Sequence, residues 1–153
     1  MNEIYTPFIR SGSFEVKSSK EKIFPLLCPK MEEKWIPGWE CEVIYSKSGY
    51  NEDGAIFKTQ KPYGTELIWY TITFDMQNGI VNFLNFAKEL FLFRFNIVIK
   101  KIYNEKSVLT FTQTFTPLSE KGIGMIDGYK NEDFKTKLSS LGNLIEKYLN
   151  KSV

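Results

Sequence analysis

The sequence predicts an α+β protein in which a curved antiparallel sheet of six to seven strands wraps around one long C-terminal helix, with two short helices after the first strand. Long segments rich in β-branched and aromatic residues follow one another between residues 67 and 117. After Asn131 the apolar residues recur every three or four positions, as on an amphipathic helix. A strongly curved sheet buries its concave face most economically against such a helix.

The N-terminal third predicts one strand and two short helices. Apolar and polar residues alternate loosely over residues 8–16, which we expect to form the first strand. Ser18 can then cap a helix, with Glu21 placed to reach back to its amide. Pro29 ends this short helix, and residues 32–35 form another brief turn before a Pro-Gly break.

The rest of the chain predicts a meander followed by the long helix. Turn residues separate extended segments, and no helical pattern interrupts them. We expect strands over 39–47, 67–75, 80–88, 91–103 and 108–117, with a further strand before residue 60. The glycine-rich segment 122–128 is predicted to connect them to the final helix, whose apolar stripe comprises Phe134, Leu138, Leu141, Ile145 and Tyr148.

Composition limits the classes of partner. At 153 residues the chain is expected to form one domain, over 1–153, with a core of its own. Twenty basic residues face eighteen acidic ones without a dense basic cluster, which argues against nucleic acid as a partner. No window is apolar enough for a membrane span and the N-terminus lacks a signal-peptide pattern, so we expect a cytoplasmic protein.

Few residues suggest catalysis, and none suggests a metal or a cofactor. Histidine is absent, which removes the commonest general base and metal ligand. Cys28 and Cys41 are expected to be buried free thiols rather than zinc ligands. The glycines of 122–128 lack the βαβ context of a dinucleotide site. Acidic pairs are expected to be solvated, so no catalytic residue is assigned; these pairs are Glu32/Glu33, Glu40/Glu42 and Asp127/Asp133.

Several short motifs resemble the bacterial START-like proteins of the SRPBCC superfamily. They are Phe24–Pro29, Glu32, Trp35, Pro37–Trp39, Gly54–Thr59, Trp69, Asp75 and Thr116–Gly122. The resemblance implies the helix-grip fold and one START-like domain over nearly the whole chain. It also implies that a small, largely apolar ligand, lipid-like or aromatic, binds between the sheet and the C-terminal helix. Two alternatives stay open, namely a polyketide cyclase or aromatase-like enzyme and a co-chaperone-like interaction domain.

The alternation of the strands predicts which side chains face such a cavity. Tyr70 is expected to point inward with Ile68, Ile72 and Phe74, and the odd-numbered residues from Phe91 to Ile99 do likewise. In the last strand Gln113 falls among inward apolar residues. The expected ligand-binding residues are Phe14, Trp35, Trp39, Phe57, Tyr70, Phe83, Asn85, Phe93, Phe95, Phe111, Gln113, Leu138 and Leu141.

Alternatives stay open for the polar and tryptophan positions. Gln113 must bond either a neighbouring polar group or water, or a ligand, because a buried amide without partners costs about 1–3 kcal/mol. Arg10 is expected either at the cavity mouth, as an anion clamp, or in solvent. Trp35 and Trp39 either cover the pocket or plug the end of the sheet.

Overall fold

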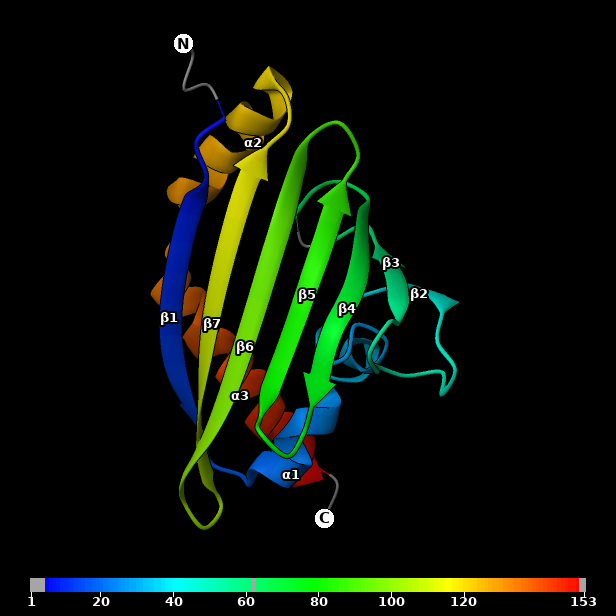
Figure 1. Ribbon diagram of the computed structural model, residues 1–153. Helices are drawn as coiled ribbons and strands as arrows, with labels where there is room; N and C mark the ends of the chain where they lie inside the picture. Colours follow the sequence, from blue (N-terminus) through cyan, green and yellow to red (C-terminus); the bar gives the residue numbers. More distant parts are fainter. Residues whose placement is uncertain (1–4, 62, 152–153) are drawn as a thin grey trace.

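The computed structural model describes residues 5–61 and 63–151 as one seven-stranded antiparallel sheet with helices against one face (Figure 1). None of the helices in these ranges is long and apolar enough to cross a membrane. In chain order the elements are β1 (Phe8–Val16), α1 (Lys20–Ile23), the 3-10 helices η1 (Phe24–Leu26) and η2 (Met31–Lys34), β2 (Cys41–Tyr45), β3 (Ile56–Thr59), β4 (Leu67–Asp75), β5 (Ile80–Ala87), β6 (Phe91–Tyr103), β7 (Lys106–Pro117), α2 (Glu120–Lys130) and α3 (Phe134–Lys151).

The predicted arrangement of the sheet and the long helix is confirmed. Strands β2 to β7 form the meander, each beside its neighbour in sequence, and β1 pairs with β7 at the far edge. The β1–β7 register runs from Phe8 opposite Phe115 to Val16 opposite Ser107. In Figure 1 the chain of α3 passes behind the sheet, on the face away from the viewer.

The face of the sheet toward α3 carries the aromatic core. Every second residue of β6 from Phe91 to Ile99 is buried, as the two-residue period of a strand requires. Phe93 stacks on Phe115 of β7 with ring centroids 4.3 Å apart and planes 3° from parallel. This alternation confirms the inward direction expected for β6 and β7.

Two glycines let α3 approach β1 closely. A Cβ atom on Gly12 of β1 would lie 2.7 Å from Cδ1 of Leu138 in α3. A Cβ atom on Gly142 of α3 would likewise lie 2.9 Å from Cδ2 of Phe14. A Cβ atom at either position would require the neighbouring side chain to shift, so glycine permits the close approach of α3 to this edge of the sheet.

Two predictions at helix ends are wrong. Ser19, rather than Ser18, is the N-cap of α1, and its hydroxyl accepts the amide of Lys22. The segment 122–128 is not a connector but lies within α2, which Ser119 caps by accepting the amide of Gly122. A Cβ atom on Gly122 would fall 1.8 Å from the carbonyl oxygen of Leu90, so glycine here serves helix packing rather than a loop.

The expected facing of β4 is also wrong. Tyr70 and Ile72 are exposed, whereas Trp69 and Thr71 are buried. The inward pair is held by hydrogen bonds: Nε1 of Trp69 donates to Oγ1 of Thr59 at 2.9 Å, and Oγ1 of Thr71 donates to Oδ1 of Asn51 at 2.6 Å. A register shift between Thr71 and Thr73 then turns the following residues over.

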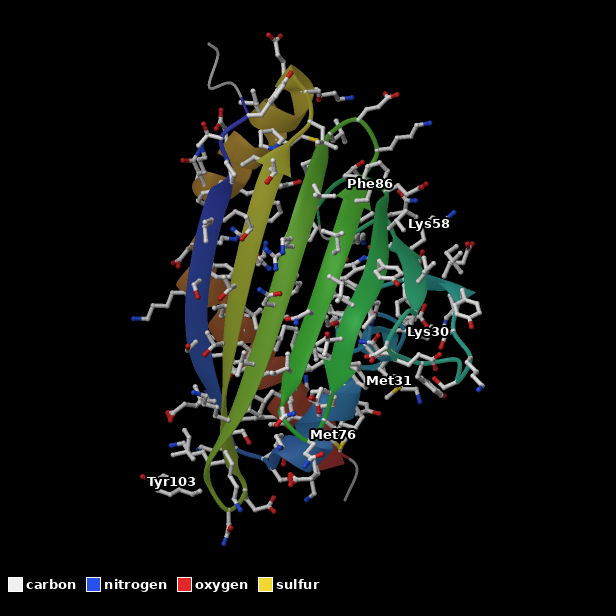
Figure 2. The ribbon with its side chains drawn as sticks, in the orientation of Figure 1. Lys30, Met31, Lys58, Met76, Phe86 and Tyr103 are labelled. Atoms are coloured by element: carbon white, nitrogen blue, oxygen red, sulfur yellow. The ribbon has the colours of Figure 1, made fainter. Side chains whose placement is uncertain are left out.

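The outer face of the sheet bears an apolar patch, to which the observed phase of β4 contributes two residues. Tyr70, Ile72 and Phe86 form it, each between 43% and 46% exposed. Phe86 lies near the end of β5, where Figure 2 labels it. Their exposure separates them from the inward-facing core.

The stacked position of Phe93 gives a test of the facing. Phe93→Asp is expected to abolish cooperative folding, because an ionised carboxylate would enter an aromatic stack with no counter-charge. Phe86→Asp, on the outer apolar patch, should change the free energy of unfolding by less than about 0.5 kcal/mol. Denaturant unfolding monitored by circular dichroism measures both, and a cooperatively folding Phe93→Asp variant would contradict the assignment.

Candidate ligand-binding site

A partly enclosed cavity of about 230 Å³ lies between the sheet, η2 and α3. An engineered cavity of about 150 Å³ already admits benzene, so this one has room for a molecule somewhat larger than a single ring. Its lining residues are Arg10, Leu27, Glu32, Trp35, Ile36, Trp39, Tyr63, Trp69, Phe95, Ile97, Phe111, Gln113, Phe134, Lys137, Leu138 and Leu141. A larger groove of about 510 Å³ runs along the outer side of η2 and α3, but it is open and bordered by charged side chains.

The expected ligand-binding residues fall into three groups. Those that line the cavity are Trp35, Trp39, Phe95, Phe111, Gln113, Leu138 and Leu141. Phe14, Phe57, Phe83, Asn85 and Phe93 are buried but do not line it. Phe83 and Phe14 support the wall instead, with rings 5.1 Å from Trp69 and 5.2 Å from Phe111. Tyr70 points to solvent, so its expected inward position is wrong.

All three tryptophans of the chain border the cavity, and protein atoms accept each indole N–H. Trp35 donates to the carbonyl oxygen of Leu26 at 3.0 Å, and Trp39 donates to that of Pro29 at 2.7 Å. The N–H of Trp69 is taken by the Thr59 hydroxyl described above. The tryptophans therefore present ring surface to the cavity and no free donor.

Gln113 belongs to a buried polar network. Its Oε1 accepts from Nε of Arg10 at 2.8 Å, and its Nε2 donates to the hydroxyl of Tyr63 at 3.3 Å. Burial raises the pKa of Tyr63 above its usual range, so this phenol stays neutral. Neighbouring polar groups therefore satisfy the amide, which is one of the alternatives given above. Both the oxygen and the nitrogen of the Gln113 amide are hydrogen-bonded to the protein at the cavity wall.

Arg10 is neither in solvent nor free to clamp an anion. Its Nη1 donates to the carbonyl oxygen of Tyr129 at 3.2 Å and to Oε1 of Glu132 at 3.0 Å. The guanidinium also lies 4.3 Å from the ring centroid of Phe134. Glu132 further accepts from Lys137 at 3.1 Å. Burial by itself would raise the pKa of Glu132, but the hydrogen bonds and charge attraction of Arg10 and Lys137 together lower it.

Glu32 and Glu33 do not form the solvated pair that the sequence suggested. Glu33 points away from the cavity, bonds Nζ of Lys30 at 2.8 Å and accepts the amide of Cys41, and its pKa is lowered. Glu32 lines the cavity, and burial raises its pKa to about 8. It keeps some accessible surface because the cavity wall is itself accessible. Adjacent carboxyls in the 3-10 helix η2 thus have opposite environments.

An amide and two thiols are also buried, outside the cavity lining. Both side-chain polar atoms of Asn85 lack a hydrogen-bond partner among the described residues. Asn85 is fully buried on the inward face of β5, opposite Trp69 and Phe93 in the neighbouring strands. Cys28 and Cys41 are buried and free, as predicted. Within residues 5–61 and 63–151 no group of three or more potential ligands gathers for a metal ion.

The sequence did not identify Glu32, Tyr63 and Trp69 as lining residues. Tyr63 lies in a Pro-Tyr-Gly turn, a pattern that normally marks an exposed loop. An inward Tyr70 would place its neighbour Trp69 on the outer face, whereas the structure buries Trp69. For Glu32, nothing in the local sequence separates it from the adjacent Glu33.

The opposite pKa shifts of the two carboxyls predict opposite pH effects. The unfolded chain releases the Glu32 proton near pH 4.5 and the folded chain near 8, so stability is lost as the pH rises between these values. Glu32→Gln removes this loss. The free energy of unfolding of the variant, relative to that of wild type, should therefore increase by about 1–3 kcal/mol between about pH 5 and pH 9.

Glu33→Gln is the matched control. The pKa of Glu33 is 4.5 in the unfolded chain and lower in the folded chain. Glu33 therefore stabilises the fold above pH 4.5, and this stabilisation is lost as the pH falls through the folded pKa. That variant should be less stable than wild type at neutral pH, by no more than about 1 kcal/mol, with the difference vanishing in acid. Urea unfolding across this pH range measures both, and parallel pH profiles would refute the assigned environments.

Comparison with known proteins gives structural likeness alone. No protein-family model and no curated protein matches the sequence. Norcoclaurine synthase from Thalictrum flavum, solved with dopamine and hydroxybenzaldehyde, superposes with a TM-score of 0.70 at 13% identity, covering 97% of this chain and 90% of that one. The Zhui aromatase/cyclase from Streptomyces sp. R1128 superposes with a TM-score of 0.73 at 7% identity, and the match covers 97% of each chain.

A hypothetical protein from Helicobacter pylori gives a TM-score of 0.66 at 10% identity, covering 92% of this chain and 87% of that one. At such identities the likeness establishes the fold and nothing finer. The neighbours share the curved sheet and long C-terminal helix of the START-like superfamily. The expected fold is thus confirmed: the chain has a helix-grip architecture, a curved antiparallel sheet around a long C-terminal helix.

Proposed function

We propose that the protein binds a small, largely apolar molecule in the cavity between the sheet, η2 and α3. The observation that carries this proposal is a partly enclosed space of about 230 Å³ whose walls are mainly tryptophan, phenylalanine, leucine and isoleucine. Apolar walls with a few placed polar groups are typical of small-molecule sites. Removal of the ligand's apolar surface from water supplies the driving force.

The polar groups of the cavity define how such a ligand is oriented. The Arg10–Gln113–Tyr63 network joins β1, β7 and the loop before β4. Glu32 comes from η2 and has no such network. A ligand therefore meets a rigid, internally paired set of polar groups and one separate carboxyl. Norcoclaurine synthase holds small aromatic molecules in the same fold, which supports a ligand of this general size here.

A second candidate function is proton transfer, and Glu32 is the observation that favours it. A carboxyl whose pKa lies near neutrality within an apolar cavity can remove a proton from carbon beside a carbonyl group and return it. The likeness to an aromatase/cyclase fits this candidate. It requires no histidine, which the chain lacks.

Hydrogen exchange tests the second candidate. In D₂O the protein should catalyse exchange of the methyl protons of acetophenone, followed by NMR, and Glu32→Gln should reduce the rate by about a hundredfold or more. Glu33→Gln, whose carboxyl is outside the cavity, should exchange at the wild-type rate. No exchange above the buffer rate would leave binding alone as the function.

A cavity-filling variant tests the proposed binding. Leu141 lines the cavity and Asn143, two positions later on α3, is exposed. Native mass spectrometry should detect a copurified molecule, or a thermal-shift screen of aromatic and lipid-like compounds should find one that raises the melting temperature with concentration. Leu141→Trp should weaken this binding at least about tenfold, whereas Asn143→Trp should not change it.

Two results would contradict the proposal. One is equal binding by Leu141→Trp and Asn143→Trp, which would place the ligand elsewhere. The other is a wild-type protein that purifies empty and that no compound stabilises. That second result would favour the interaction-domain alternative, for which the outer apolar patch of Tyr70, Ile72 and Phe86 is the exposed surface to test.

A further inference from the structure

We infer that the ligand carries a protonated amine, which the Glu32 carboxylate and the surrounding tryptophan rings hold inside the cavity. This inference rests on the proposed binding function and adds the chemical class of the ligand. It follows from which groups in the cavity wall already have partners and which do not.

Glu32 is the acidic group of the cavity left without a partner. No described residue forms an ion pair or side-chain hydrogen bond with its carboxylate, whereas Glu33 next to it has two such contacts. A carboxylate in an apolar wall is costly unless a cation or a donor meets it. A ligand ammonium group supplies both a positive charge and N–H donors.

The tryptophans suit a cation and offer nothing to a hydrogen-bond acceptor. Each indole N–H is already bonded to the protein, so Trp35, Trp39 and Trp69 contribute only ring surface. Ring faces attract ammonium groups through their quadrupole, most strongly for tryptophan. Three such residues and one carboxylate line the same space of about 230 Å³.

The positively charged side chains of the cavity, Arg10 and Lys137, are already paired, so the cavity does not favour an anionic ligand. Arg10 and Lys137 both bond Glu132, and Arg10 also bonds Gln113. An anionic ligand would have to share cations that already have a carboxylate. Among the other titratable groups of η2 and the cavity wall, Glu33 pairs with Lys30. Raised pKa values keep the thiols of Cys28 and Cys41 neutral at physiological pH, and burial keeps the Tyr63 phenol neutral.

The protonation of Glu32 makes the expected binding depend on pH. Below its pKa of about 8 the carboxyl is mostly neutral, so an ammonium ion must displace its proton on binding. Affinity for an amine should therefore rise by up to about tenfold per pH unit until that pKa, and then level off until the amine itself loses its proton near about pH 10.

Three probes of the same shape test the charge. Phenylpropylamine, phenylpropanol and phenylpropanoate are titrated into the protein with tryptophan fluorescence as the signal, since every tryptophan borders the cavity. At about pH 8.5 wild type should bind the amine at least about tenfold more tightly than the alcohol, which corresponds to about 1.4 kcal/mol. Glu32→Gln should lose this preference while its affinity for the alcohol stays within about twofold, and Glu33→Gln should keep it.

The outcomes separate this inference from the function on which it rests. If the alcohol or the acid binds wild type as tightly as the amine, the amine assignment is wrong although the cavity binds. The amine assignment is also wrong if Glu32→Gln keeps the preference for the amine. It is wrong as well if the affinity of wild type for the amine does not change between about pH 6 and pH 8. If none of the three probes binds and the compound screen is also empty, the binding function itself fails.

Discussion

The guanidinium of Arg10 ties together the parts of the molecule that enclose the cavity. From β1 it reaches Gln113 on β7, the carbonyl of Tyr129 near the end of α2, and Glu132 before α3. Phe134, the first residue of α3, lies over the same group. The last carbonyls of a helix attract positive charge, so this cation stabilises the end of α2 and fixes where α3 begins to cross the sheet.

The walls of the cavity also hold the elements that form it. Trp35 and Trp39 donate their indole N–H groups to the carbonyls of Leu26 and Pro29, and these bonds connect the segment after η2 to the end of η1 and the residues that follow it. The rings of both tryptophans line the cavity. Gly12 and Gly142 set the approach of α3 to β1. Because the same side chains satisfy the backbone and line the space, the packing of the fold determines the shape of the cavity.

The sequence predicted what depends on local periodicity and missed what depends on long-range packing. The inward alternation of β6 and β7, and with it the buried amide Gln113, followed from a two-residue period. Tyr70 was placed on the wrong face because nothing local fixes the phase of β4 before its register shift. Glu32 was missed because its burial requires a 3-10 turn to fold over a sheet formed by residues far along the chain.

The pairing of β1 with β7 has a consequence for synthesis of the chain. Arg10 and its partner Gln113 are 103 residues apart, and the β1–β7 ladder joins segments with similar separations. On the ribosome, β1 emerges long before β7 exists, and its edge stays unpaired while the meander is translated. A nascent chain therefore cannot close the sheet until β7 is released, and α3 follows later still. The cavity, whose lining includes residues of α3, is therefore complete only after this helix has been translated.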